Sequence, residues 1–342
     1  MIRHFAATLM ALAVVTATPA EATPSRIPAA DREVVFTADG TTVYGTLHVP
    51  ERRAGQRLRA ALLLPGSGPT DRDGNQPPGS APDTLTQLAD ALDEDGIASL
   101  RFDKYGTGRT GLGAYQDHPE ELDYPAFIRQ AQTAYKTLRE QPETDPRELL
   151  VVGHSEGAMT GLILGSTVHP RPSGLALLQP QAIRLLDLVT LQLKDQIAEA
   201  TRQGQLTPEQ QRTVNAAIDA AVNSLREHRP VDTTDLLPAI AELFESFQGP
   251  NARFVDSDDA VYPPDTAAAL RPGTKVLLTC GTNDAQVPCA TTNALTAALR
   301  RADAGGPGRV TLPGVDHLLH DADSPDTLAS PVVDALRRFA RH

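Results

Sequence analysis

The sequence predicts an α/β fold, in which a mostly parallel sheet is covered by helices on both faces. Short runs rich in aliphatic residues alternate along the chain with segments of helical pattern. Continuous apolar strands of this kind are buried on both faces, and their alternation with helices is typical of parallel sheets. The runs are RAALLLPG, IASLRFD, LLVVG, GLALLQ, KVLLTCG and RVTLPG.

Residues 1–22 have the pattern of a secretory signal peptide. Arg3 and His4 precede an apolar run, and the segment ends at the small-x-small site Ala20-Glu21-Ala22. The run is too short for a stable bilayer anchor, and it has no polar face that an amphipathic first helix would need. We therefore expect the mature chain to begin near Thr23 and to be secreted or periplasmic, without a membrane anchor.

The first elements after residue 22 read as a pair of strands. REVVFTADGTTVYGTLHVP contains two alternating runs joined by Asp39-Gly40, which is a strong turn pair. The later aliphatic runs are separated by stretches of helical pattern. These predicted helices are Leu85 to Asp95, Pro125 to Arg139, Ala158 to Ser166 and Ala290 to Ala302.

Residues 181–264 interrupt the alternation, because no convincing strand occurs in them. The segment contains amphipathic helical patterns rich in Gln and Ala, one of them starting with Thr207 as N-cap and Pro208 at its first position. We expect a helical insertion at 181–264, with residues 23–180 and 265–342 forming the core.

Composition excludes several classes of partner. The 342 residues include 31 basic and 43 acidic side chains, a net charge of -12, and only 4% aromatic residues. Such a chain, without a basic run, is not suited to bind nucleic acid. Neither HExxH nor paired CxxC occurs, so we expect no metal and no cofactor. The sequence does not indicate an oligomeric state.

The chain has two cysteines, Cys280 and Cys289, in TCGTNDAQVPC. An even number of cysteines in an exported protein favours a disulfide, and the alternative is a pair of buried thiols. A disulfide would hold the short loop between them.

The stretch VVGHSEGAM has the features of a nucleophile elbow. In a G-x-S-x-G turn between a strand and a helix, Ser155 is held in a strained conformation that requires glycine at 153 and 157. The N–H of Glu156 then lies at the helix N-terminus, where it can bind an oxyanion. A plain glycine-rich turn is the alternative interpretation.

A serine nucleophile needs a base and an orienting acid, which follow the serine in chain order on this kind of fold. Asp284 follows the run KVLLTCG, and His317 follows RVTLPG. We predict Ser155, His317 and Asp284 as nucleophile, base and acid. The alternatives are Asp256, Asp258 and Asp259 for the acid and His320 for the base.

The loop LLLPGSGPTDRDGN is expected to supply a second oxyanion donor, the N–H of Ser67. Gly66 and Gly68 would allow the backbone to approach a substrate closely. We interpret the following Asp71-Arg72-Asp73 as bracing this loop through ion pairs. The glycine-rich RFDKYGTGRTG lacks the Lys-Ser/Thr pattern of a phosphate-binding loop.

Taken together, GSGPTDRDGN, RFDKYGTGRT, GHSEG, GTNDAQVP and GVDHLL resemble the α/β-hydrolase superfamily of serine hydrolases. The combination is similar to a bacterial exported esterase-type family, related to acyl and cinnamoyl-type esterases and to prolyl-oligopeptidase-like catalytic domains. The resemblance implies an eight-stranded sheet, the roles assigned above and a helical cap over an acyl pocket. This sequence departs from the family at Ala158, where a glycine is common, and at Tyr105, where an arginine is common.

Three functions are compatible with these residues. An exported hydrolase of small to medium acyl or aryl esters is the first, acting through an acyl-enzyme on a small-molecule substrate. A peptidase or amidase with the same triad is the second, and Glu242 or Glu245 would then be candidates to hold a substrate amino terminus. A non-catalytic binding protein on the same scaffold is the third.

Overall fold

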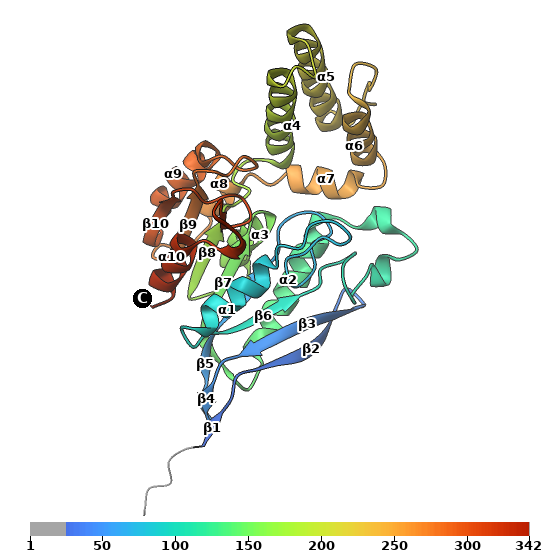
Figure 1. Cartoon of the computed structure of the whole chain (residues 1–342). Coiled ribbons are helices and arrows are strands. Elements are labelled where there is room, and N and C mark those ends of the chain that lie inside the picture. The colour runs from blue at the N-terminus through green and yellow to red at the C-terminus, as the bar shows by residue number, and fades with distance from the viewer. Residues whose placement is uncertain (1–24, 342) are drawn as a thin grey trace, which may run out of the picture.

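The computed structural model describes residues 25–341, so the predicted signal peptide lies outside the described residues. Its centre is an eight-stranded sheet with the order β10-β9-β8-β7-β5-β6-β3-β2 (Figure 1). Two short strand pairs, β1 with β4 and β11 with β12, lie outside it. The strands are β1 (Arg26–Ile27), β2 (Ala30–Ala38), β3 (Thr41–Val49), β4 (Arg52–Arg53), β5 (Leu58–Leu64), β6 (Ala98–Phe102), β7 (Thr144–His154), β8 (Gly174–Leu178), β9 (Lys275–Gly281), β10 (Gly305–Leu312), β11 (His320–Asp321) and β12 (Ser324–Leu328).

The sheet is parallel from β10 to β6, and β3 and β2 extend it in antiparallel pairing. The turn between β2 and β3 is made by Asp39 and Gly40, whose φ angles are 44° and 77°. Two consecutive positive φ angles are what a tight two-residue hairpin needs. The predicted α/β class with a mostly parallel eight-stranded sheet is confirmed.

Helices cover both faces of the sheet, and alternate strand residues point to each layer. Leu63 and Val152 pack with α1 (Thr84–Asp93) and α10 (Ser330–Arg341) on one face. Leu64 and Val151 face a second layer. That layer contains α2 (Tyr124–Arg139), α3 (Glu156–Thr167), α8 (Pro263–Ala268) and α9 (Asn293–Arg301). The described chain also forms short 3-10 helices, which are η1 (Gly113–Tyr115), η2 (Pro119–Glu121) and η3 (Cys289–Thr292).

Between β8 and β9 the chain forms an insertion that we call the cap, residues Leu185–Asp259. It contains α4 (Leu185–Arg202), α5 (Pro208–Arg226), α6 (Pro238–Gln248) and α7 (Ala252–Asp259). Thr207 caps α5 in a reciprocal capping box, with Pro208 as the first helical residue. The cap has its own apolar core, which includes Ile218 and Phe244.

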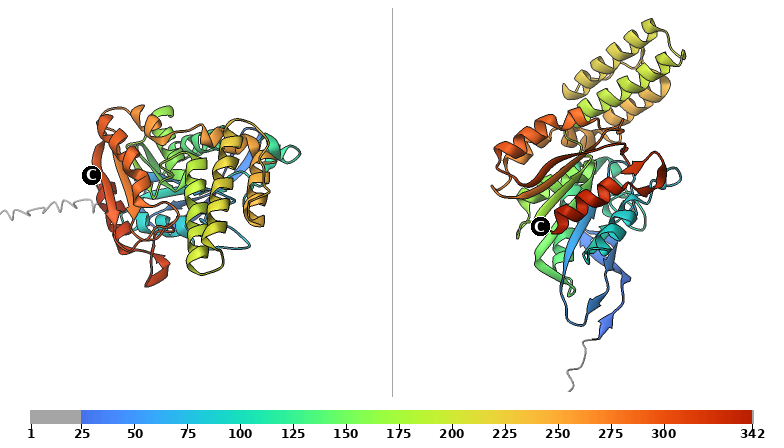
Figure 2. Two further views of the ribbon diagram at one scale, coloured as in Figure 1. Left: turned by 90° about the horizontal axis from the view of Figure 1, so that it is seen from above. Right: turned by 60° about the vertical axis from the view of Figure 1, so that its left-hand side comes forward.

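Figures 1 and 2 show α4, α5 and α6 projecting from the sheet, with α7 between them and the core. Contacts of α7 with both α4 and α2 join the cap to the core. Within residues 25–341, no helix is long and apolar enough to cross a membrane.

Candidate active site

Ser155 lies on a tight turn between β7 and α3, with φ 55° and ψ -120°. The turn leaves no room for side chains at the flanking glycines. A Cβ on Gly153 would lie 2.1 Å from the Gly157 carbonyl oxygen, and one on Gly157 would lie 2.3 Å from that of Leu64. The N–H of Ser155 donates to the Leu178 carbonyl at 3.0 Å, which ties the turn to β8. The strained serine conformation is therefore maintained by close backbone packing.

The structure brings Ser155, His317 and Asp284 into one hydrogen-bonded chain. His317 Nδ1 lies 2.9 Å from Asp284 Oδ2, and His317 Nε2 lies 3.1 Å from Ser155 Oγ. All three residues are buried, with exposed fractions of 7%, 9% and 5% for Ser155, His317 and Asp284. With a proton on Nδ1, which the carboxylate favours, Nε2 is free to accept the serine proton.

Asp284 is held in its loop by backbone bonds and by a disulfide. Its Oδ1 accepts hydrogen bonds from the N–H groups of Gln286 and Val287, at 2.9 and 2.7 Å. Cys280 and Cys289 are joined across this loop by a disulfide, with their Cα atoms 5.1 Å apart. The predicted disulfide is confirmed, and it closes the loop that carries the candidate acid.

The loop after β9 and the loop after β10 pack directly on each other. The N–H of Asn283 donates to the Val315 carbonyl at 3.0 Å, and the N–H of Gly314 donates to Thr282 Oγ1 at 2.8 Å. Gly281 permits this approach, because a Cβ there would lie 2.1 Å from the Val315 carbonyl oxygen. Asp284 and His317, which are far apart in sequence, meet for this reason.

His154 holds the backbone of His317. Its Nε2 lies 2.7 Å from the His317 carbonyl oxygen, so a neutral ring with its proton on Nε2 donates to that carbonyl. Burial, with a smaller contribution from nearby His317, lowers the pKa of His154 to about 3. The elbow pattern predicts no separate role for residue 154. No spacing rule would have revealed this contact, which joins the last residue of β7 to the loop after β10.

The alternative acids and base lie elsewhere. Asp256, Asp258 and Asp259 belong to α7, and none of them hydrogen-bonds to His317. Asp258 Oδ1 accepts from Gln181, and Asp259 pairs with an arginine of the cap. His320 is buried, and its backbone N–H donates to the Asp316 carboxylate.

The two predicted oxyanion donors lie beside the serine. A Cβ on Gly66 would lie 3.3 Å from Ser155 Cβ, so the loop after β5 passes directly over the elbow. Ser67 and Glu156 both line the hollow at Ser155. Within residues 25–341, no protein group accepts a hydrogen bond from the N–H of Ser67 or of Glu156. Both donors are therefore available to a bound group.

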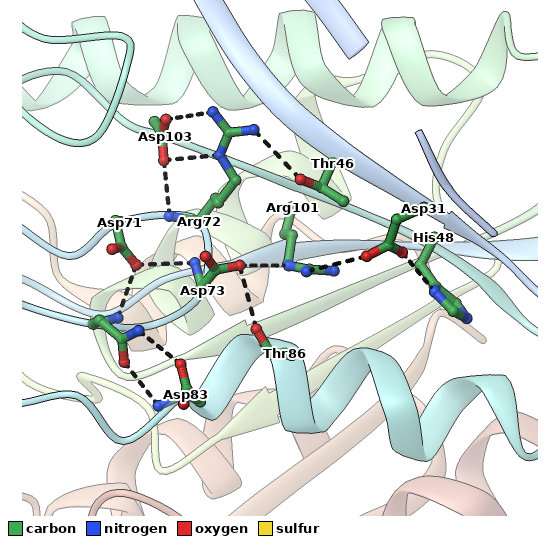
Figure 3. A network of polar contacts seen from close by, with 11 residues as sticks. Asp31, Thr46, His48, Asp71, Arg72, Asp73, Asp83, Thr86, Arg101 and Asp103 are labelled. Carbon is green, nitrogen blue, oxygen red and sulfur yellow. Dashed lines mark hydrogen bonds and ion pairs between the residues drawn. The ribbon is translucent and has the colours of Figure 1, made fainter. Parts of the chain in front are cut away.

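Ion pairs brace the loop after β5 (Figure 3). Arg72 binds Asp103 through Nε and Nη2, at 3.1 and 2.6 Å. Asp73 binds Arg101 at 3.0 Å, and Asp71 Oδ1 accepts the N–H groups of Asp73 and Asn75. Arg101 lies near the end of β6, and Asp103 is the residue directly after that strand. The end of β6 therefore supports the neighbouring loop.

Tyr105 occupies the position where the family commonly has arginine. Its hydroxyl donates to the Ala38 carbonyl at 3.1 Å, and its ring packs edge-on against Tyr115 and Phe127. Burial raises its pKa well above the usual value, so the phenol stays neutral. In this chain an uncharged hydrogen bond and aromatic packing therefore stabilise the loop. The arginine that is common at this position would instead place a positive charge there.

A cavity of about 580 Å³ opens between the cap and the core above Ser155. We call it the cap cavity. Its walls are mainly apolar, with Leu122 and Phe127 from the core and Leu188, Val189 and Phe247 from the cap. A second hollow of about 200 Å³ also reaches Ser155 and is lined by more polar residues, including Thr70, Gln76 and Ser80. The volume of the larger cavity is typical of small-molecule sites, whereas the second hollow is smaller than most of them.

Comparisons with known proteins place these features in a family. No curated protein matches the sequence. The fold resembles Est1E from Butyrivibrio proteoclasticus with bound ferulic acid, at 17% identity, TM-score 0.52, and coverage of 90% of this chain and 97% of that one. It also resembles the Pyrococcus horikoshii acylaminoacyl peptidase, at 12% identity, TM-score 0.55, and coverage of 91% and 40%.

At these identities the two structures show a shared fold. The family model described as "Alpha/beta hydrolase family" matches residues 61–330, which include the elbow, Asp284 and His317. This match spans most of the chain and agrees with the sheet order and the strained serine turn described above. The chain therefore belongs to the alpha/beta hydrolase family.

Proposed function

We propose that the protein is an exported serine esterase that cleaves carboxylic esters of small to medium acyl or aryl groups. The observation that carries this proposal is the hydrogen-bonded chain of Ser155, His317 and Asp284 at the floor of an apolar cavity. A buried serine contacting an oriented histidine is the arrangement that activates a hydroxyl as a nucleophile.

In the proposed mechanism, Ser155 Oγ attacks the ester carbonyl while His317 Nε2 takes its proton. Asp284 stabilises the imidazolium that forms, and the N–H groups of Ser67 and Glu156 bind the developing oxyanion. His317 then protonates the leaving alcohol, which leaves an acyl-enzyme on Ser155. Water attacks this acyl group by the same steps in reverse roles and releases the acid.

The lining of the cap cavity supports esters over peptides as substrates. Glu156 is the one acidic residue that lines the cavity in the part of the chain that the structure describes, and it lies near Lys104. Glu242 and Glu245, the candidates to bind a substrate amino terminus, are exposed and do not line the cavity. An apolar wall stabilises an acyl or aryl group by excluding water from it.

The disulfide supports the export part of the proposal. Cys280 and Cys289 are paired, and disulfides persist mainly in oxidising compartments outside the cytoplasm. The pattern of residues 1–22 remains a prediction.

The first experiment is hydrolysis of a matched panel by the mature protein and its Ser155→Ala variant. The panel contains p-nitrophenyl esters from acetate to laurate and aminoacyl p-nitroanilides. We expect ester turnover that falls by about 10⁴-fold or more in Ser155→Ala, because the nucleophile is lost. Ser166→Ala, the same change at the far end of α3, is the matched control and should keep wild-type activity.

Other outcomes would redirect the proposal. Turnover of anilides alone would identify a peptidase or amidase with the same triad. No turnover on either set, together with no labelling of Ser155 by a fluorophosphonate, would indicate a binding protein on a hydrolase scaffold.

A further inference from the structure

Lys104 is a buried cation directly beneath the loop that carries Ser67. It comes two residues after the end of β6 and is 6% exposed. Its Nζ donates to the Gly66 carbonyl oxygen at 2.6 Å, while the nearest carboxylate oxygen, Glu156 Oε1, is 3.6 Å away. Burial of an ammonium group costs free energy unless the group is paired and hydrogen-bonded. We therefore expect the bond between Lys104 and the Gly66 carbonyl to have a specific role.

The Gly66 carbonyl and the Ser67 N–H belong to the same peptide unit. The peptide bonds of residues 25–341 that are cis are Pro77-Pro78 and His169-Pro170, so the unit between Gly66 and Ser67 is trans and planar. In such a unit the N–H points opposite to the C=O. A donor that holds the Gly66 oxygen therefore sets the direction in which the Ser67 N–H points.

The next peptide unit is held as well. The Ser67 carbonyl accepts hydrogen bonds from Thr70 Oγ1 at 2.8 Å and from Gln76 Nε2 at 3.0 Å. These two bonds lie within the loop itself, whereas Lys104 reaches the loop from the segment after β6. Its neighbour Asp103 anchors Arg72 of the same loop (Figure 3).

We propose that Lys104 is a positioning residue of the oxyanion hole: its bond to the Gly66 carbonyl directs the Ser67 N–H at the oxyanion. This inference rests on the proposed function. The positive charge on the carbonyl side also polarises the peptide unit, which makes its N–H a stronger donor. The effect is largest in the tetrahedral intermediate, where the substrate oxygen carries negative charge.

A purely structural role for Lys104 would be to neutralise Glu156. Glu156 Oε2 is buried without a hydrogen-bond partner in the described part of the chain, so removal of the lysine would leave that carboxylate uncompensated. The double variant Lys104→Met with Glu156→Gln separates the two roles. Neutralisation predicts that the loss caused by Lys104→Met disappears in the Glu156→Gln background, whereas positioning predicts that it persists.

The test compares Lys104→Met with Lys275→Met. Lys275 also donates to a backbone carbonyl, that of Phe339 at 2.5 Å, but at the start of β9, the end of the strand opposite to Asp284. Steady-state kinetics on a p-nitrophenyl ester and the affinity for an alkyl boronic acid, which forms a tetrahedral adduct with the serine, are measured for each variant.

We expect Lys104→Met to lower kcat by about 10- to 100-fold and to leave KM within about threefold, since an oxyanion donor acts mainly in the transition state. Boronic acid affinity should fall by a similar factor. Lys275→Met should change neither quantity. Unchanged kcat in folded Lys104→Met, or recovery in the Glu156→Gln background, would overturn the inference.

A measurement on the wild-type protein covers the case in which Lys104→Met does not fold. In a crystal structure of the boronate adduct, we expect a boronate oxygen within about 3 Å of the Ser67 nitrogen, with Lys104 still on the Gly66 carbonyl. A Ser67 N–H turned away from the adduct would refute the role. Absence of ester turnover by the wild type overturns the proposed function, and the inference with it, whereas an active wild type with an equally active Lys104→Met overturns the inference alone.

Discussion

Burial makes His154 a neutral hydrogen-bond donor at any pH at which the enzyme would work. It is buried next to the elbow, and its bond to the His317 carbonyl uses the proton on Nε2. The ring centroids of His154 and His317 are 4.9 Å apart. A positive charge on His154 would therefore lie beside His317, which becomes cationic in the proposed mechanism. The His154 side chain therefore supports His317 by binding the His317 backbone carbonyl, and it does not transfer a proton.

The depressed pKa of His154 gives a stability prediction. In the unfolded chain a histidine binds a proton below about pH 6.5, while folded His154 stays neutral until about pH 3. The unfolded state binds more protons in this window, so His154 causes stability to fall as the pH drops, by roughly 1.4 kcal/mol per pH unit at most.

His154→Gln should remove this dependence, because a glutamine amide can donate in place of Nε2 but does not titrate. Urea unfolding at pH 7, 6 and 5 measures the free energy of unfolding of both proteins. We expect the wild type to lose more stability than the variant between pH 7 and pH 5. Parallel slopes for the two proteins would show that His154 is not the group responsible.

At the scale of elements, the loop between β9 and η3 links the disulfide to the candidate acid. Cys280 and Cys289 are separated by 9 positions, and Asp284 lies between them. Thiol titration of the denatured, unreduced protein should find no free thiol, and two free thiols would contradict the pairing.

Replacement of both cysteines by alanine should destabilise the protein by about 2.5 kcal/mol, the entropy of closing a short loop. It should also lower ester kcat, because the loop that orients Asp284 is released. Urea unfolding and turnover measured on the same sample test both effects. A destabilised variant with wild-type kcat would mean that the bonds of Asp284 to Gln286 and Val287 hold the acid without the disulfide.

The elements themselves follow closely from local pattern, with one informative difference. The segment Ala290 to Ala302 reads as one helix, but the α-helix begins only at Asn293 and is preceded by a 3-10 turn. In that turn the Thr291 and Thr292 hydroxyls donate to the carbonyls of Pro288 and Cys289. Side-chain bonds of this kind compete with the α-helical pattern, and periodicity does not reveal them.

At the scale of the whole molecule, the cap cavity exists because the cap lies over the elbow. Val189 on α4 lines it from the cap side, so under the proposed function its side chain would limit the length of the acyl group. Val189→Trp should reduce turnover of the laurate ester by about tenfold or more while acetate turnover changes little, since several buried methylenes lose their place in the cavity.

The ratio of laurate to acetate kcat/KM across the ester panel measures this effect. Ala216→Trp, at an exposed position of α5 in the same cap, is the matched control and should leave the ratio unchanged. An equal loss on both esters in Val189→Trp would mean that the substitution disturbs the catalytic groups and not the space for the acyl chain.

The sequence by itself determined the class of the fold, the strained turn at Ser155 and the order of serine, acid and histidine. These are local properties: strand and helix periodicity, and a glycine pattern that close backbone packing requires. Tertiary structure decided the remaining features of the site, because those features depend on which loops meet at the edge of the sheet. It brought Asp284 rather than Asp256, Asp258 or Asp259 to His317, placed His154 and Lys104 on backbone carbonyls of other loops, and set the size of the cavity beneath the cap.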